Sequence, residues 1–274
     1  MRSLRNLDKD FIGGDTRIML PYIGPVAVYP MTFVVGFLVA GGVAFRLGTG
    51  AGVGPRFAAV ILLAALFMLL GGKAHSLLER GAFAIPITQE LIYGYRYPGG
   101  FAAFIISLWV GSTYIVPQAG FALLGDIFAP ALGFAIAIIR FGCFLSGCCF
   151  GTICSLPWAV EFPSGSRAWH AHQSLGVIAS DAVHSLPVHP LQLYMAGFGL
   201  IMGIFLLWFQ KRKQFDGQVF LLYLVLHGTA KFFVEFFRHD HILTVQLMAL
   251  AMALVGAALL GAAELRRQPS KPSL

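Results

Sequence analysis

Charged residues are scarce in this chain, and their scarcity excludes most kinds of soluble protein. Lys, Arg, Asp and Glu make up 11% of the 274 residues, whereas a soluble domain carries about 25%. Hydrophobic residues make up 58%, and the mean hydropathy is +0.78. The composition therefore predicts an integral membrane protein. The net charge of +7 is no sign of a nucleic-acid partner, and we expect none. The basic residues cluster at the ends of apolar segments, where they act as topology signals and lipid-headgroup contacts.

Several membrane architectures are also disfavoured by patterns that the sequence lacks. No run of alternating polar and apolar residues predicts the strands of a membrane barrel. No internal repeat is visible, and no pair of broken helices predicts a transporter. The first apolar segment is too long, and its front too charged with both signs, for a cleaved signal peptide.

Seven apolar segments are each close to the ~20 residues that cross a bilayer. The segments are Tyr22–Phe45, Phe57–Leu78, Gly99–Val116, Phe121–Leu145, Pro190–Phe209, Gly217–Phe237 and Ile242–Ala263. Without a barrel, only helices satisfy their backbone groups in lipid. The predicted fold class is an all-α integral membrane protein with about seven transmembrane helices and a small extracytoplasmic head region.

The segments divide the chain into five predicted parts. These are an N-terminal extracytoplasmic segment 1–21, helices one to four in 22–151, an extracytoplasmic head 152–189, helices five to seven in 190–264, and a cytoplasmic tail 265–274. The head is a polar stretch too long for an ordinary connection. The short loop Lys211–Lys213 is basic, so the positive-inside rule places the C-terminus in the cytoplasm and the N-terminus outside. A competing group of basic residues near the N-terminus favours the opposite orientation, so charge alone leaves the orientation open.

Residues 140–151, Arg-Phe-Gly-Cys-Phe-Leu-Ser-Gly-Cys-Cys-Phe-Gly, end the fourth segment. An unpaired arginine near membrane depth is costly, so Arg140 is a candidate site residue whose natural partner is a lipid phosphate. The alternative is a structural ion pair with Glu235 or Asp126.

Other polar residues are predicted on the same external side as Arg140. They are His189, Arg238 and the stretch Glu79–Pro98, which holds Gln89, Glu90 and Arg96. Such convergence of polar groups predicts a binding site. Lys231 lies about two helical turns before Arg238, so the pair could clamp an anion, or Glu235 between them could neutralise both. Arg238 could instead snorkel to the interface, and His189 could simply begin a helix.

The chain resembles the prolipoprotein diacylglyceryl transferase family, because several of the family's motifs occur in the same order along most of its length. An Arg-x-Gly signature with two later glycines is matched by Arg140, Gly142, Gly147 and Gly151. His-Pro-x-Gln-Leu-Tyr is matched from His189 to Tyr194, and Glu-Phe-x-Arg from Glu235 to Arg238. Further family positions are Tyr29, Gly71–Lys73, Gly99–Gly100, Asp126, Pro157–Val160 and Phe162–Pro163.

The resemblance implies transfer of the diacylglyceryl group of phosphatidylglycerol to the lipobox cysteine of a prolipoprotein signal peptide, in the bacterial inner membrane, with release of glycerol 1-phosphate. It implies no cofactor and no metal. The implied catalytic residues are Arg140, His189, Tyr29 and Lys231. The implied substrate-binding residues are Arg238, Glu235, Gly99, Gly100, Gly142, Gly147, Gly151, Ser146, Gln192 and Tyr194.

This chain departs from the family pattern at positions around the implied site. They are Pro98 for a histidine, Cys143 and Ser146 for asparagines, Cys148 for a glutamate, and Lys231 for an arginine. Two alternatives follow from these departures: a phospholipid-dependent transferase with a different acceptor, and a phospholipid-binding membrane protein without catalysis.

The four cysteines Cys143, Cys148, Cys149 and Cys154 fall in one short stretch. Their spacing does not match a zinc knuckle. Cys148 or Cys149 could form a disulfide with Cys154, the thiols could serve as small hydrophobes, or one could act as a nucleophile. Histidine pairs at 170 and 172 and at 239 and 241 could bind a metal or lie solvated at the interface.

Overall fold

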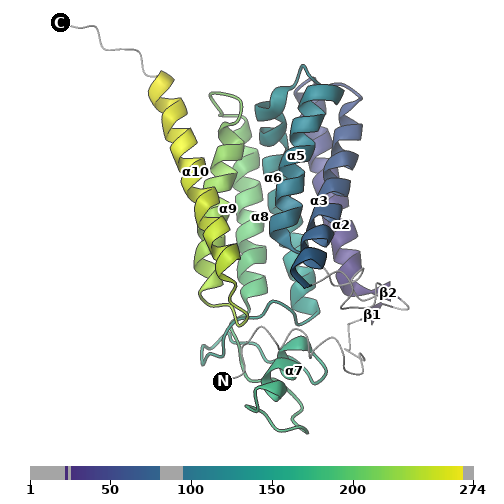
Figure 1. The fold of residues 1–274 in the computed structure, drawn as a ribbon, viewed down its shortest axis with the longest axis vertical. Helices are drawn as coiled ribbons and strands as arrows, with labels where there is room; N and C mark the ends of the chain where they lie inside the picture. Colours follow the sequence, from purple (N-terminus) through teal and green to yellow (C-terminus); the bar gives the residue numbers. More distant parts are fainter. Residues whose placement is uncertain (1–21, 24–25, 81–94, 268–274) are drawn as a thin grey trace, which may run out of the picture.

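The computed structural model describes residues 22–23, 26–80 and 95–267, arranged as long helices side by side with a small region at one end (Figure 1). The long elements are α2 (Val28–Gly50), α3 (Phe57–Arg80), α5 (Tyr97–Val110) with its π-helical continuation η2 (Gly111–Ile115), α6 (Gly120–Leu145), α8 (Leu191–Gln210), α9 (Gln218–Glu235) and α10 (Leu243–Arg267). The predicted segment 1–21, most of the polar stretch before α5, and residues 268–274 of the tail lie outside the described residues.

The predicted all-α membrane fold is confirmed. Among the described helices, six are long and apolar enough to cross a membrane. The seventh long helix, α9, has 18 residues and buries several polar side chains, including His227, Lys231 and Glu235. It runs beside α8 and α10 through the bundle (Figure 1), so its polar residues face protein.

The largest differences from the predicted boundaries are in the first and last helices, and α2 also continues to Gly50, five residues past its predicted end. The first segment was predicted to be helical from Tyr22, but β1 (Tyr22–Ile23) pairs antiparallel with β2 (Val26–Ala27), and α2 begins only at Val28. Gly24 and Pro25, between the two strands, are residue types that favour a turn over a helix. At the other end of the chain, α10 continues to Arg267, three residues into the predicted tail 265–274.

Helix α6 lies at the centre of the bundle and packs against α2, α8 and α9. Glycines allow its close approach to α8: a Cβ on Gly133 would lie 2.7 Å from the Cα of Gly203. Small residues have this role in membranes because dispersion contacts replace the hydrophobic drive between helices. The deep aromatic core includes Phe57, Phe104 and Tyr223, all almost fully buried.

A buried carboxylate fixes the end of the bundle that is distant from the head. The carboxylate of Asp126 accepts hydrogen bonds from the backbone N–H groups of Gly217 and Phe220, at 2.8 and 2.9 Å, and from Lys213 Nζ at 2.9 Å. It therefore caps the start of α9, where free N–H groups favour an anion. Asp126 is thus occupied far from Arg140, and the predicted alternative of an Arg140–Asp126 pair is wrong.

Residues 152–189 form a small region against the end of the bundle where α6 ends and α8 begins (Figure 1). Its one helix, α7 (Arg167–Ser174), is capped by Ser166, whose side chain accepts a hydrogen bond from the Trp169 N–H. Isolated bridges connect Val188 to Ile153 and Val160. A core of Phe150, Phe162, Ala168, Ala171 and Val188 fills it.

Candidate site for an anionic lipid

A cavity of about 250 Å³ lies between the helices, with its polar lining near the head. Its apolar walls include Phe33, Phe37, Phe101, Phe104, Leu132 and Ile136. Its polar lining includes Tyr29, Arg140, Cys143, Ser146, Cys148, Cys149, Arg167, His227, Lys231, Arg238 and Asp240. The polar lining comes largely from the end of α6, the end of α9 and the first residue of α7. A cationic end joined to an apolar interior suits an amphiphile with an anionic headgroup.

Arg140 lines this cavity and lacks a carboxylate partner among the residues that the structure describes. Both carboxylates proposed for it are engaged elsewhere: Asp126 binds Lys213, and Glu235 binds Lys231 and lies 3.8 Å from Arg238 Nε. Among the described residues, no carboxylate forms an ion pair with Arg140. An arginine in apolar surroundings is stabilised by an anion, and its planar fork can bind two phosphate oxygens.

Lys231 and Arg238 instead belong to a balanced ion network. Lys231 Nζ donates to Glu235 Oε2, and both side chains are buried. Arg238 donates from Nη2 to Asp240 Oδ2 at 3.0 Å. The sequence left open whether Lys231 and Arg238 clamp an anion or are neutralised by Glu235. The structure shows the second arrangement, in which Glu235 lies beside both cations. Lys231 and Arg238 are thus paired with Glu235 and Asp240, and Arg140 adds a positive charge that neither carboxylate balances.

Of the residues predicted to be catalytic, Tyr29, Arg140 and Lys231 line the cavity, and His189 does not. The His189 ring lies 5.4 Å from the Phe237 ring, and its Nδ1 is 3.5 Å from Tyr194 Oη. The same Tyr194 hydroxyl accepts a hydrogen bond from Trp158 Nε1 at 2.7 Å. His189 and Tyr194 therefore connect the head to the start of α8.

Some of the predicted substrate-binding residues line the cavity, and others lie outside it. Arg238 and Ser146 line the cavity, but Gln192 is buried behind it and donates to the Cys148 carbonyl at 2.7 Å. Glu235 reaches the site only through its two cationic partners. Gln192 and Glu235 thus position residues that line the cavity.

None of the five predicted site glycines is among the residues that line this cavity. An added Cβ would lie within 3.0 Å of neighbouring atoms at four of them, and Gly147 has a φ of 62°. The four close contacts are Gly99 with His75 and the Gly71 carbonyl, Gly100 with the Tyr95 hydroxyl, Gly142 with Thr32, and Gly151 with His189. The structure therefore places these glycines in helix and loop contacts.

Sequence reasoning missed Arg167 and His227, both of which line the cavity. Arg167 begins α7, and its position in the polar head was the only signal in the sequence. His227 lies one helical turn before Lys231, which could have identified it. Its ring stacks on Tyr223 at 5.4 Å with an interplanar angle of 3°, and both ring nitrogens are buried without a hydrogen-bond partner.

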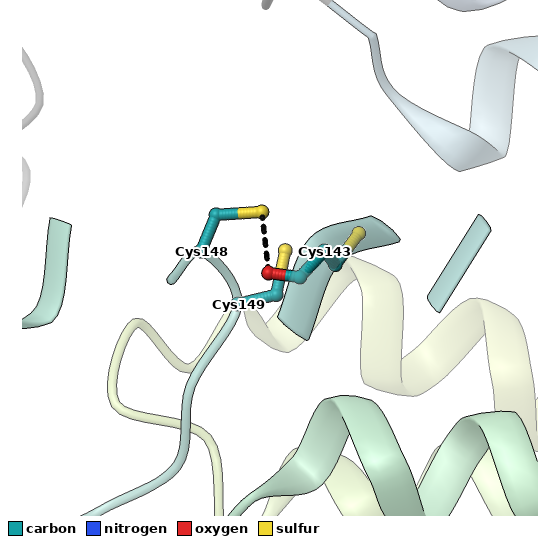
Figure 2. Close-up of side chains that lie close together, drawn as sticks. All are labelled: Cys143, Cys148 and Cys149. Atoms are coloured by element: carbon teal, nitrogen blue, oxygen red, sulfur yellow. Dashed lines mark hydrogen bonds between the residues drawn. The ribbon is translucent and has the colours of Figure 1, made fainter. Parts of the chain in front are cut away.

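Three thiols gather at the end of α6 (Figure 2). The Sγ atoms of Cys143, Cys148 and Cys149 all lie within 4.8 Å of one another, and all four cysteines of the chain are free, so the proposed disulfides to Cys154 are not formed. Hydrogen bonds from the other two thiols lower the pKa of Cys149, and the guanidiniums of Arg238 and Arg140 lower it further. Burial of the thiol acts in the opposite direction and raises the pKa.

The fold defines a multi-pass membrane protein with a cation-lined cavity, and comparison with known proteins identifies its family. The family model described as prolipoprotein diacylglyceryl transferase matches residues 18–262, and the chain belongs to that family. A protein from Pasteurella multocida (strain Pm70) named phosphatidylglycerol–prolipoprotein diacylglyceryl transferase is 26% identical over 262 residues, which cover 87% of this chain and 88% of that protein. One of the same name from Clostridium tetani (strain Massachusetts / E88) is 33% identical over 115 residues, which cover 42% of this chain and 41% of that relative.

Proposed function

We propose that this protein transfers the diacylglyceryl group of phosphatidylglycerol to the lipobox cysteine thiol of a prolipoprotein and releases glycerol 1-phosphate. The observation that carries the proposal is the excess positive charge of Arg140 at the polar end of an apolar cavity. The phosphate of the lipid would lie against Arg140, and its acyl chains would lie against the aromatic and aliphatic walls. The names of the family's members support the same class of reaction.

The proposed step is a displacement at carbon. The acceptor sulfur forms a bond to the terminal glyceryl carbon of the diacylglyceryl group, and the bond from that carbon to the phosphate oxygen breaks. The electron pair stays on the oxygen, so the leaving glycerol phosphate gains negative charge. Arg140 stabilises this developing charge more than it stabilises the intact lipid, which lowers the barrier.

The surrounding residues have supporting roles in the proposal. Arg238 contributes a second guanidinium whose own charge is balanced by Asp240. Lys231, held by Glu235, adds a positive field from the wall of the cavity. Tyr29 offers a hydroxyl at the reacting centre, and His189 supports the segment at Gly151 from outside the cavity.

The proposed orientation places the head outside the cytoplasm, where secreted precursors present their lipobox. The basic loop at Lys211–Lys213, at the other end of the bundle, would then face the cytoplasm, as the positive-inside rule expects. Labelling of single introduced cysteines with a membrane-impermeant reagent tests this in intact cells with their outer barrier opened. A cysteine at Trp158 should react and one at Gln214 should not; the reverse pattern would refute the orientation.

The reaction is tested with purified protein in nanodiscs, labelled phosphatidylglycerol and a synthetic lipobox peptide. Arg140→Ala should slow peptide labelling by about 100-fold or more, as removal of a preorganised donor does elsewhere. The control is Arg212→Ala, because that guanidinium stacks on Trp208, 4.0 Å from the ring centroid, at the other end of the bundle. Equal labelling by the two variants would refute the role of Arg140.

A second candidate function is supported by Pro98, which lines the cavity and has no group that can accept a proton. In that case the cavity binds phosphatidylglycerol but does not transfer its diacyl group to a lipobox thiol. Lipid bound tightly by the wild-type protein and weakly by Arg140→Ala, with no peptide labelled by either, would favour this function or a different acceptor.

A further inference from the structure

The segment after α6 brings three cysteine side chains to one point. Cys143 lies in the last turn of α6, and Cys148 and Cys149 follow the turn at Gly147, whose φ is 62°. Cys149 has a φ of 59°, and it is the single non-glycine residue with positive φ in the part of the chain that the structure describes. Such a backbone conformation is costly for a residue with a side chain and is concentrated at functional sites. Here it turns the chain so that both neighbouring sulfurs approach Cys143 (Figure 2).

The spacing of the sulfurs is close to that of a zinc site. Three thiolates at about 2.3 Å from a tetrahedral Zn²⁺ would lie about 3.8 Å apart. The three Sγ atoms lie within 4.8 Å of one another, so small rotations about the Cα–Cβ bonds would close the cluster. Cys148 Sγ now donates to the Cys143 carbonyl at 3.6 Å (Figure 2). Loss of its proton would turn that contact repulsive and free the sulfur to bind a cation.

The cluster opens toward the cavity. Cys143, Cys148 and Cys149 all line the cavity, whereas Cys154 does not. Cys143 and Cys148 are almost fully buried, and the Gln192 amide holds the Cys148 carbonyl from behind. A metal bound by these three residues would therefore have its fourth position toward the cavity, as catalytic zinc sites do.

The neighbouring charges fit a metal-thiolate centre. Three thiolates and one Zn²⁺ have a net charge of −1, and the lining beside them includes Arg140, which has no carboxylate partner among the described residues. Arg238 Nη2 lies 3.9 Å from Cys149 Sγ. Arg140 lies three residues before Cys143, on the same face of α6. Hydrogen bonds to ligating sulfur orient the ligand and offset its charge.

We propose that Cys143, Cys148 and Cys149 bind Zn²⁺ as thiolates and that the acceptor thiol takes the fourth coordination position; the second clause rests on the proposed function. A thiol bound to zinc loses its proton, which passes to solvent. The sulfur then forms its bond to the glyceryl carbon as the carbon–oxygen bond breaks. Zinc undergoes no redox change, and no further reactant is needed. The metal thus activates the acceptor in a cavity where Pro98 offers no base.

Metal binding is tested first, without any turnover. Full-length protein in nanodiscs, reduced and treated with a chelator, is titrated with Zn²⁺ and with Co²⁺, whose thiolate complexes absorb in the near ultraviolet. We expect one equivalent of either metal per chain and a cobalt–thiolate band. Cys148→Ser with Cys149→Ser should abolish both, and Cys154→Ser should change neither. A folded wild-type protein that shows no such band would overturn the proposal without reference to any variant.

The fourth position is tested with the same cobalt protein and two lipobox peptides. A peptide with its cysteine should shift the cobalt spectrum, and the matched peptide with serine in its place should leave the spectrum unchanged. Identical spectra with the two peptides would overturn coordination of the acceptor.

The transfer assay then separates the zinc proposal from the proposed function. Removal of zinc should lower peptide labelling at least tenfold, and zinc added back should restore it. Equal labelling by the chelated and the zinc-loaded protein would overturn the zinc role and leave the transferase intact. Stoichiometric zinc with no labelling under any condition would support the metal site and refute the transferase.

Discussion

Lys231 and Glu235 form a buried ion pair one turn apart on α9, in which Lys231 Nζ donates to Glu235 Oε2 and the carboxylate is fully buried. Glu235 is also 3.8 Å from Arg238 Nε, and its other oxygen accepts from the Ile242 N–H at 3.4 Å. One carboxylate thus connects α9 to the segment that leads into α10.

Glu235→Gln should therefore destabilise the protein strongly, because it leaves a buried lysine without its counter-charge. Removal of one partner of a buried pair typically costs about 3–5 kcal/mol. Lys231→Met should also destabilise, and the double variant should lose less than the sum of the two single losses. Thermal unfolding in one detergent measures all three variants. Strictly additive losses would show that the two side chains do not interact.

Asp126→Ala should destabilise the end of the bundle remote from the cavity. The change removes two backbone hydrogen bonds and the ion pair to Lys213, and loss of a helix cap alone costs about 1 kcal/mol. The matched control is Asp216→Ala, which removes the exposed carboxylate that the same lysine binds at 2.7 Å. Such surface pairs contribute about 0–1 kcal/mol. Comparable losses from the two changes would contradict the capping role of Asp126.

The head should lose stability in mild acid through His172. Burial lowers the pKa of His172, and the neighbouring His239 lowers it further, while its Nδ1 accepts the Leu186 N–H at 3.1 Å. Between the lowered folded pKa and the ordinary value of about 6.5, the unfolded head binds more protons than the folded head. The contribution of His172 is therefore complete above about pH 6.5 and declines as the pH falls.

Hydrogen exchange at α7 measures this effect across the pH range. Protection should fall below about pH 6.5 in the wild-type protein, and His172→Gln should flatten the dependence because glutamine does not titrate. His184→Gln, at an exposed histidine of the same head, is the control and should retain the wild-type profile. A His172→Gln profile that still falls in acid would assign the effect to another group.

Gly133→Ala should weaken the contact between α6 and α8, because the new methyl group would lie 2.7 Å from the Gly203 backbone. Gly197→Ala on α8 is the matched control, since a Cβ there meets nothing within 4 Å. Alanine is favoured over glycine in a helix by about 1 kcal/mol, so the control should be neutral or stabilising. Thermal unfolding should separate the two variants in opposite directions, and a stabilised Gly133→Ala would show that the helices can move apart without cost.

The class of protein could be read from the sequence because it depends on local properties. Scarce charge and seven apolar segments predict helices in lipid without any knowledge of their neighbours. The ends of five helices were predicted within two residues because polar residues or turn formers flank each segment. The start of α2 was missed because Tyr22–Ala27 is as apolar as the helix that follows it.

The sequence by itself determined a helical membrane protein with Arg140, Lys231, Glu235 and Arg238 as its unusual intramembrane charges, because any charge in an apolar segment is conspicuous. Only the tertiary structure decided which of these charges cancel. Glu235 pairs with Lys231 and Arg238, and Asp126 pairs with Lys213. The positive charge of Arg140 is therefore not balanced by either carboxylate. The meeting of Cys143 with Cys148 and Cys149 was likewise decided by the backbone at Gly147 and Cys149. Ion pairing and ligand geometry depend on distances across the fold, and sequence spacing does not contain them.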